Sequence, residues 1–184
     1  LTHPSHTAIH SGRYPGSFGI RLNGMDPLPT GADTLAERLI TAGYRTAAIV
    51  ASVVLDTGSG LDQGFDLYDD EIDRPVQSLM AMTELQRTGG EVTSAARAWL
   101  VKQQRPWFLW VHYYDPHLPY AAPAAHVKAA GGRPYDAEIA YVDSETGSLL
   151  KSVDRTSTTI VVTSDHGESL GEHGEVDHGY FLYD

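Results

Sequence analysis

The chain has 184 residues, 41% of them hydrophobic and 20% charged, which is enough apolar material for a globular unit. Its formal net charge of −11 argues against a nucleic-acid partner, because such a surface needs clustered Lys and Arg. The lack of cysteine excludes disulfides and thiolate chemistry and leaves the cellular compartment open. No apolar run reaches the length of a membrane span, and membrane association stays open as well.

The first pattern in chain order is a short helix followed by a strand. Four apolar side chains share one face of this helix, namely Leu35, Ala36, Leu39 and Ile40. Asp33 or Thr34 can cap its start and Gly43 can close its end. A buried strand is then predicted over Thr46 to Val50.

Two further helix and strand pairs follow. The second helix has its apolar face at Val92, Ala96, Trp99 and Leu100. It runs to about Gln104, and Pro106 stops it before a strand from Trp107 to Val111. The third helix has its apolar face at Ile139, Val142, Thr146, Leu149 and Leu150, and a buried strand is predicted from Thr159 to Thr163.

This alternation predicts an α/β fold with a mainly parallel sheet and helices on both faces. The segment Asp69 to Gly90 is polar and has no periodicity, so we interpret it as an excursion from the sheet. The segment Ala121 to Pro134 is rich in Ala, Gly and Pro and is predicted to be a surface loop.

The stretch after the last predicted strand, SDHGESLGEHGEVDHGY, contains a candidate metal site. Asp165 and His166 stand at the carboxyl end of that strand, where open α/β sheets place their ligands. A carboxylate and an imidazole suit a hard or borderline divalent cation. The alternative is an aspartate that caps a helix and a histidine that packs or faces solvent. His173 and His178 follow in the same loop.

Several segments together resemble the sulfatases of the alkaline phosphatase superfamily. Their positions run in the family's order: THPSH at 2–6, SGRYP at 11–15, FGIRLN at 18–23, GYRT at 43–46, LDQGFD at 61–66, HYYDPHLPY at 112–120 and DHGESLGEHG at 165–174. Each match alone is weak, whereas their order across the chain is specific. The resemblance implies an alkaline-phosphatase-like core and a metal-dependent ester hydrolase acting on a small-molecule or glycan ester.

The resemblance also assigns roles to individual residues. Thr2 stands at the nucleophile position, Asp165 and His166 are expected to bind the metal together with Thr2, and His6 stands where the family has an arginine that holds the nucleophile. Calcium is the first expectation for the ion, and the imidazole also suits manganese or zinc. His117 and His178 are expected to contact ester oxygens, and His178 lies where some relatives have a lysine; for His173 a functional and a structural role are equally supported.

Family members begin with a strand that ends in a pair of aspartates, which would lie before Leu1. Residues 1–184 are therefore expected to be part of a single sulfatase-like catalytic domain, incomplete at both ends and inactive alone. The resemblance gives a periplasmic or extracellular location as an expectation only.

Two departures from the family pattern bear on the substrate. Threonine cannot become the formylglycine that most sulfatases use, because its β-carbon carries a methyl group and would oxidise to a ketone. The lysine and histidine that clasp sulfate are missing as well, since residues 51–54 hold ASVV. We therefore expect phosphodiester or phosphonate ester cleavage over sulfate ester cleavage. Two alternatives remain: a phosphoryl-group transferase of the same superfamily, and an inactive binding module with the same fold.

Overall fold

The computed structural model describes residues 1–24, 26–73, 85–104, 106–175 and 178–179. A three-stranded sheet lies at its centre, with β1 (Arg45–Ile49) between β2 (Leu67–Asp69) and β3 (Trp107–Val111). Both pairings are parallel, so the carboxyl ends of the strands share one edge. The strands Arg45–Ile49 and Trp107–Val111 pair along their full lengths.

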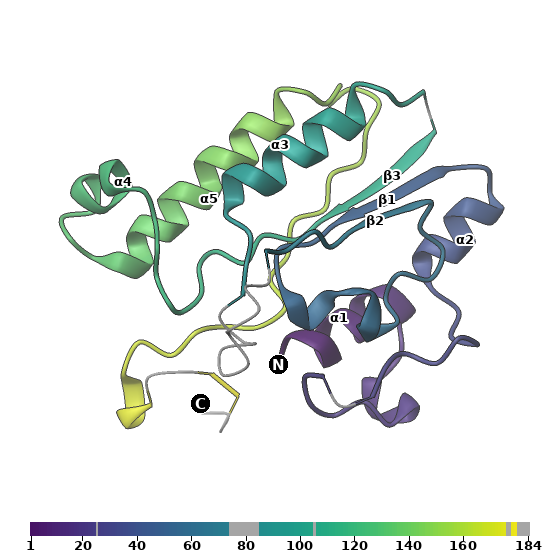
Figure 1. The fold of residues 1–184 in the computed structure, drawn as a ribbon, viewed down its shortest axis with the longest axis horizontal. Helices are drawn as coiled ribbons and strands as arrows, with labels where there is room; N and C mark the ends of the chain where they lie inside the picture. Colours follow the sequence, from purple (N-terminus) through teal and green to yellow (C-terminus); the bar gives the residue numbers. More distant parts are fainter. Residues whose placement is uncertain (25, 74–84, 105, 176–177, 180–184) are drawn as a thin grey trace.

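Helices cover both faces of the sheet, which confirms the predicted α/β fold (Figure 1). The helices are α1 (Thr2–Ser11), α2 (Leu35–Thr41), α3 (Gly89–Leu100), α4 (Ala124–Ala129) and α5 (Pro134–Leu150). Helices α3 and α5 lie side by side on one face, whereas α1 and α2 lie on the other. The described residues also form short 3₁₀ helices: η1 (Pro15–Phe18), η2 (Val53–Leu55), η3 (Thr57–Ser59) and η4 (Glu172–Gly174).

The core divides at β1, whose successive side chains point to opposite faces. Ile49 packs with Val92 and Ala96 of α3 on one face. Val50, the next residue, packs on the other face with Leu55 and Leu61. Both layers are fully buried at β1, which explains why this strand lacks the polar alternation of a half-exposed strand.

Capping boxes begin two of the predicted helices. Thr34 accepts the backbone N–H of Glu37 and the Glu37 side chain returns to the Thr34 N–H, so Thr34 rather than Asp33 is the N-cap. Thr88 and Glu91 repeat the arrangement at the start of α3. This second helix ends at Leu100, short of the predicted Gln104.

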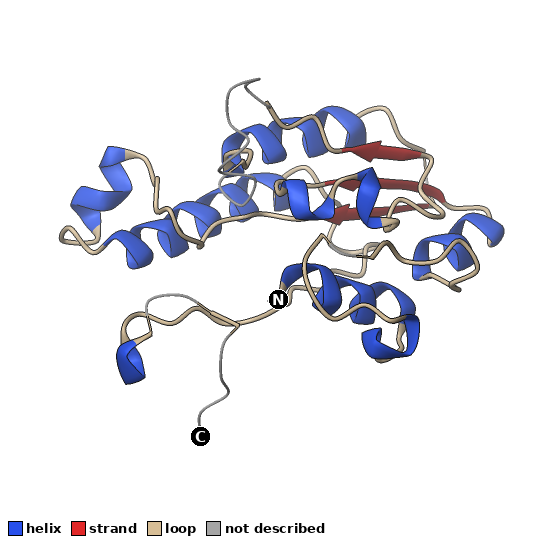
Figure 2. Cartoon of the chain, turned by 60° about the horizontal axis from the view of Figure 1, so that its bottom comes forward, coloured by secondary structure: helices blue, strands red, loops and turns tan. Residues whose placement is uncertain are grey.

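The predicted buried strand at Thr159 to Thr163 is wrong for this chain. Its residues form a loop (Figure 2), and Val161 and Val162 are 82% and 79% exposed. A β-branched apolar run becomes a strand only where a neighbouring backbone takes its hydrogen bonds, and none of the described residues pairs with this segment.

Two segments without a clear apolar pattern differ from their predictions. The predicted loop Ala121 to Pro134 contains the helix α4, which packs against α5. The predicted excursion Asp69 to Gly90 gives its first residue to β2 and its last two to α3, and residues 74–84 lie outside the described part. No described helix combines the length and the apolar character needed to cross a membrane.

Candidate functional site

Helix α1 positions the residues of the THPSH segment. Its buried side chains recur every three or four positions, at Thr2, His3, His6, Thr7 and His10, so one helix face packs inward although it is polar. Gly12 ends the helix in the left-handed conformation, and its N–H bonds the carbonyl of Ala8. The helix therefore starts at Thr2 and places His6 one turn further along the same face.

Four side chains from the two ends of the chain meet at the start of α1. We call Thr2, His6, Asp165 and His166 the nucleophile cluster. Thr2 Oγ1 lies 3.3 Å from His166 Nε2, and His166 Nε2 lies 3.3 Å from Asp165 Oδ2. His6 Nε2 lies 3.6 Å from the same oxygen of Asp165, and neither ring nitrogen of His6 hydrogen bonds to a described residue.

The histidines of this cluster are held neutral by burial. Burial lowers the pKa of His166, against the opposing effect of its hydrogen bond to the Gly167 carbonyl. Burial, followed by the nearby His112, lowers the pKa of His6 well below its usual value. His166 Nδ1 lies 2.9 Å from the Gly167 carbonyl, so Nδ1 carries the proton and Nε2 presents a lone pair to Thr2.

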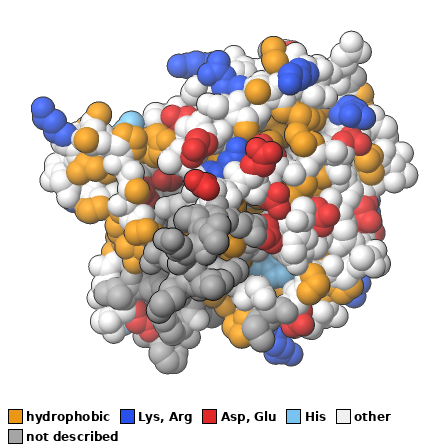
Figure 3. All heavy atoms as spheres, viewed as in Figure 1, with side chains coloured by type: hydrophobic (Ala, Val, Ile, Leu, Met, Phe, Trp, Pro, Cys, Tyr) orange, Lys and Arg blue, Asp and Glu red, His pale blue; other side chains and the backbone are white. Residues whose placement is uncertain are grey.

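A second group of side chains lies beside the first. We call His117, Glu168 and His178 the ligand triad, because one ligand atom from each lies within 4.8 Å of the other two. His178 Nδ1 is 3.1 Å from Glu168 Oε1, and the His178 ring stacks on His166 with 4.0 Å between centroids. Histidine surface is visible near acidic side chains on the face drawn in Figure 3.

The loop after β3 brings His117 to this place. Its backbone N–H donates to Glu138 Oε2 at 3.0 Å, and the Ala121 N–H donates to Glu138 Oε1. Glu138 is only 1% exposed, and burial raises its pKa. A buried carboxylate on α5 thus fixes both ends of the turn that carries His117.

The structure therefore gathers most of the residues proposed from the sequence. Thr2, Asp165 and His166 lie together, and His117 and His178 lie 4.8 Å apart by ring centroid. His6 contacts Asp165 rather than Thr2. His173 is exposed in η4 with φ of 56°. The role of each residue stays a prediction.

Three residues at the site were not proposed from the sequence. Glu168 is the fourth residue of DHGE and could have been found as a carboxylate three positions after Asp165. His112 directly follows β3 and packs edge-on against His6 at 5.0 Å, and burial lowers its pKa to about 3. Glu138 has no sequence signal, because its side chain accepts a backbone N–H from His117, about twenty positions earlier in the sequence.

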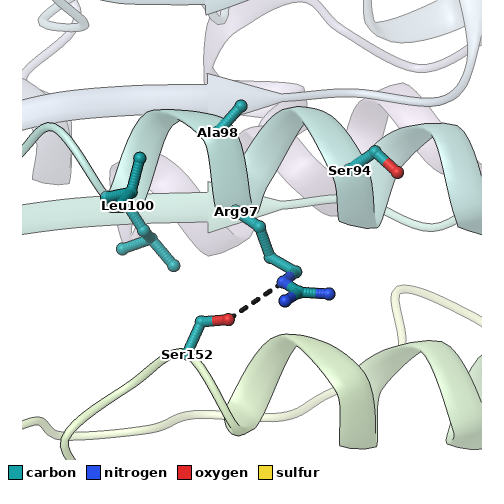
Figure 4. Close-up of a pocket in the computed structure, with 6 residues that line it drawn as sticks. Ser94, Arg97, Ala98, Leu100 and Ser152 are labelled. Carbon is teal, nitrogen blue, oxygen red and sulfur yellow. Dashed lines mark hydrogen bonds between the residues drawn. The ribbon is translucent and has the colours of Figure 1, made fainter.

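The structure also has a shallow groove between α3 and the end of α5, lined by Ser94, Arg97, Ala98, Leu100, Val101 and Ser152 (Figure 4). Arg97 donates to the hydroxyls of Ser152 and Ser148 at 3.0 and 3.3 Å. The lining contains no carboxylate and no histidine, so this groove lacks the groups for acid-base or metal chemistry.

Comparisons with known proteins identify the family and the fold of this chain. A family model described as Sulfatase matches residues 1–182. Human iduronate 2-sulfatase (Homo sapiens) is 49% identical over 45 residues, which are 22% of this chain and 8% of that protein. The short alignment by itself says little about the rest of the chain.

Two solved structures have the same fold at low sequence identity. The phosphonate monoester hydrolase of Agrobacterium radiobacter has a TM-score of 0.75 at 18% identity, over 99% of this chain and 56% of that one. A 2-O GAG sulfatase has a TM-score of 0.68 at 16% identity, over 100% of this chain and 51% of that one. The chain thus spans about half the length of these solved structures.

Proposed function

Because this chain belongs to the Sulfatase family, we propose that it carries the nucleophile of a metal-dependent hydrolase that prefers phosphodiesters or phosphonate esters to sulfate esters. The observation that supports this most directly is the chain of contacts from Thr2 Oγ1 to His166 Nε2 to Asp165 Oδ2, each of 3.3 Å. It joins a hydroxyl nucleophile to two metal-ligand types at one place.

The three donors fit a divalent cation. Donors that share a divalent ion lie roughly 3 to 3.4 Å apart, and the two contacts of 3.3 Å fall in that range. Thr2, Asp165 and His166 would hold the ion; calcium is the first expectation from the family, and the imidazole also suits manganese or zinc. When bound, such an ion lowers the pKa of the Thr2 hydroxyl and polarises the ester.

The residues of the chain supply the nucleophile and its alignment. The Thr2 oxygen forms a bond to phosphorus, and the bond from phosphorus to the leaving alcohol breaks as that oxygen takes a proton. Water then attacks the phosphorylated threonine, returns the Thr2 hydroxyl and releases the product acid. The packing of α1 holds Thr2, which is 8% exposed, so little reorganisation precedes attack.

His117 and His178 are proposed to act on the ester oxygens, either by direct contact or through a bound cation. Their ring centroids lie 4.8 Å apart and 6.3 and 4.0 Å from that of His166. His117 Nδ1 donates to the Leu118 carbonyl, which leaves its Nε2 without a proton in the neutral ring. His117 can therefore contact an anion only when it is protonated or through a cation.

Threonine decides the preferred ester in this proposal. A phosphothreonine is opened by water at phosphorus, whereas release of sulfate in the family uses the collapse of a hydrated aldehyde, which threonine cannot form. The fold neighbour named as a phosphonate monoester hydrolase supports the same choice. The neighbour named as a 2-O GAG sulfatase keeps a glycan ester among the substrates to be tested.

The test compares kcat/KM of the full-length protein on nitrophenyl esters that differ only in the acid. We expect an aryl phosphodiester or phosphonate monoester to be cleaved faster than the aryl sulfate. Thr2→Val keeps the shape of the side chain without the hydroxyl and should cleave neither ester, which ties the cleavage to this position. A higher kcat/KM for the sulfate would disprove the proposed preference.

A further inference from the structure

We propose that the ligand triad, His117, Glu168 and His178, binds a second divalent cation of the zinc type beside the nucleophile cluster. Among the described residues this is the one group of three or more histidine, cysteine or acidic side chains whose ligand atoms lie within 4.8 Å of one another. Two imidazoles and one carboxylate are a donor set of catalytic zinc sites, which leave a further position open.

Burial of Glu168 is the second observation that points to a cation. Its side chain is 4% exposed, and only Oε1 contacts a described partner, His178 Nδ1 at 3.1 Å. Oε2 accepts no hydrogen bond from any described residue. A buried carboxylate oxygen without a partner costs free energy, and a bound cation removes that cost.

One ring nitrogen of each triad histidine takes part in a hydrogen bond. His117 Nδ1 donates to the carbonyl of Leu118, and His178 Nδ1 donates to Glu168. In the neutral rings each Nε2 is then an acceptor without a proton. Second hydrogen bonds of this kind orient metal-binding histidines and fix their tautomer.

The triad is placed to act on the same ester as Thr2. The His178 ring stacks on the His166 ring at 4.0 Å between centroids, so the two donor sets are neighbours. Paired cations in hydrolases hold the attacking and leaving oxygens of one displacement, and the open position of the triad site would accept an ester oxygen. This role rests on the proposed function, whereas the metal site itself rests on the triad alone.

The competing explanation is that the triad histidines contact ester oxygens directly and bind no metal. His178→Lys separates the two, because a lysine can still contact an anion but its ammonium group repels a cation. Glu168→Gln keeps the shape of the carboxylate and removes its charge. His173→Asn is the matched control in the same loop, since asparagine tolerates the positive φ of 56°.

The experiment strips the full-length protein of metal with a chelator, dialyses it against zinc, and measures bound zinc by elemental analysis. We expect Glu168→Gln and His178→Lys each to bind about one equivalent less than the wild type, because a three-ligand zinc site does not survive loss of one ligand. His173→Asn should bind as much as the wild type. Circular dichroism melts identify variants that fail to fold.

Cobalt provides a second readout that needs neither activity nor stoichiometry. Co²⁺ in a site of this donor set absorbs visible light, and the absorbance of the wild type should exceed that of Glu168→Gln by the contribution of the triad, which should remain in Asp165→Asn. If Glu168→Gln and His178→Lys hold as much zinc as the wild type and keep its full cobalt absorbance, the second site does not exist. Failure of the proposed function would appear separately, as activity that survives Thr2→Ala.

Discussion

The nucleophile cluster and the ligand triad use similar side chains in different settings. Each combines one carboxylate with imidazoles, and the stacked rings of His166 and His178 join them. The first cluster includes a hydroxyl at the start of a packed helix, whereas the triad comes entirely from two loops. In the first cluster a hydroxyl on a packed helix thus meets donors from a loop, whereas all three potential metal ligands of the triad lie on loops.

This difference indicates a division of labour. As the proposed nucleophile, Thr2 has to be held in line with the bond that it attacks, so it would benefit from the packing of α1. In its proposed role the triad has to receive and release substrate oxygens, which loops fixed at a few points can do. Glu138 provides such a point for His117, through two backbone N–H groups.

The largest expected effect is at Thr2. Thr2→Ala removes the attacking oxygen, so kcat of the full-length protein should fall by roughly 10³-fold or more. The fold and the zinc bound by the triad should be unchanged, because Thr2 belongs to the other cluster. Steady-state kinetics with elemental analysis measures both. A variant that keeps most of its activity would place the nucleophile outside this cluster.

The next effect separates the two carboxylates. Asp165→Asn should lower kcat by roughly 10²-fold or more, together with the metal of the nucleophile cluster, because the amide loses the charge that the ion and His6 face. Glu168→Gln should remove zinc from the triad and leave the other metal bound. Equal loss of both metals in either variant would mean that the clusters form one site.

The fold was largely predictable where helices and strands carry an apolar pattern. The strand Trp107–Val111 was predicted to the residue and β1 to within one, because each contains a continuous apolar run. The run Thr159 to Thr163 carries the same signal but has no paired neighbour among the described residues, and it is a loop. Composition identifies a strand that is able to form, and hydrogen-bonding partners decide whether it does.

The sequence motifs predicted part of the site. The prediction missed residues whose contacts are far apart in the sequence. Helix α1 was missed because its buried face consists of Thr and His, which give no apolar period. Thr2, Asp165 and His166 could be proposed together only through the family resemblance, since 164 positions separate Thr2 from its partner His166. Glu168 was identified from its buried oxygen without a hydrogen-bond partner, and Glu138 from its buried oxygens that accept backbone N–H groups. Both observations require the three-dimensional structure.

A smaller effect concerns the helix beneath the nucleophile cluster. His10 is 4% exposed, packs against Trp110 and Phe65, and has its pKa lowered by burial from 6.5 to about 4. Between these values the unfolded chain binds a proton that the folded chain does not, so stability falls as pH drops from 6.5 toward 4, by about 3 kcal/mol. Urea unfolding at several pH values measures this loss.

The control for His10 is His10→Phe, which keeps an aromatic ring and cannot be protonated. It should flatten the pH dependence in that window by about the same amount, with the remaining slope due to other buried histidines such as His112. An unchanged slope would show that protonation of His10 does not limit the stability of α1. The comparison tests whether acid destabilises helix α1, which carries Thr2 and His6 of the nucleophile cluster.

The smallest effect is expected at Glu138, which is a positioning residue for the ligand triad. Glu138→Gln keeps the shape, but its amide NH₂ faces a backbone N–H where a carboxylate oxygen accepted one, so one of the bonds to His117 and Ala121 is lost. Zinc affinity of the triad and kcat should each fall by about tenfold, since one such hydrogen bond is worth about 1.5 kcal/mol. Asp143→Asn, on an exposed position of the same helix, should change neither.

Because Glu138 acts only through His117, its effect should stay below that of His117→Ala, measured as zinc affinity on the same preparation. A loss of thermal stability with unchanged zinc affinity would reduce Glu138 to a structural residue, and the loop that carries His117 would then be held by other contacts.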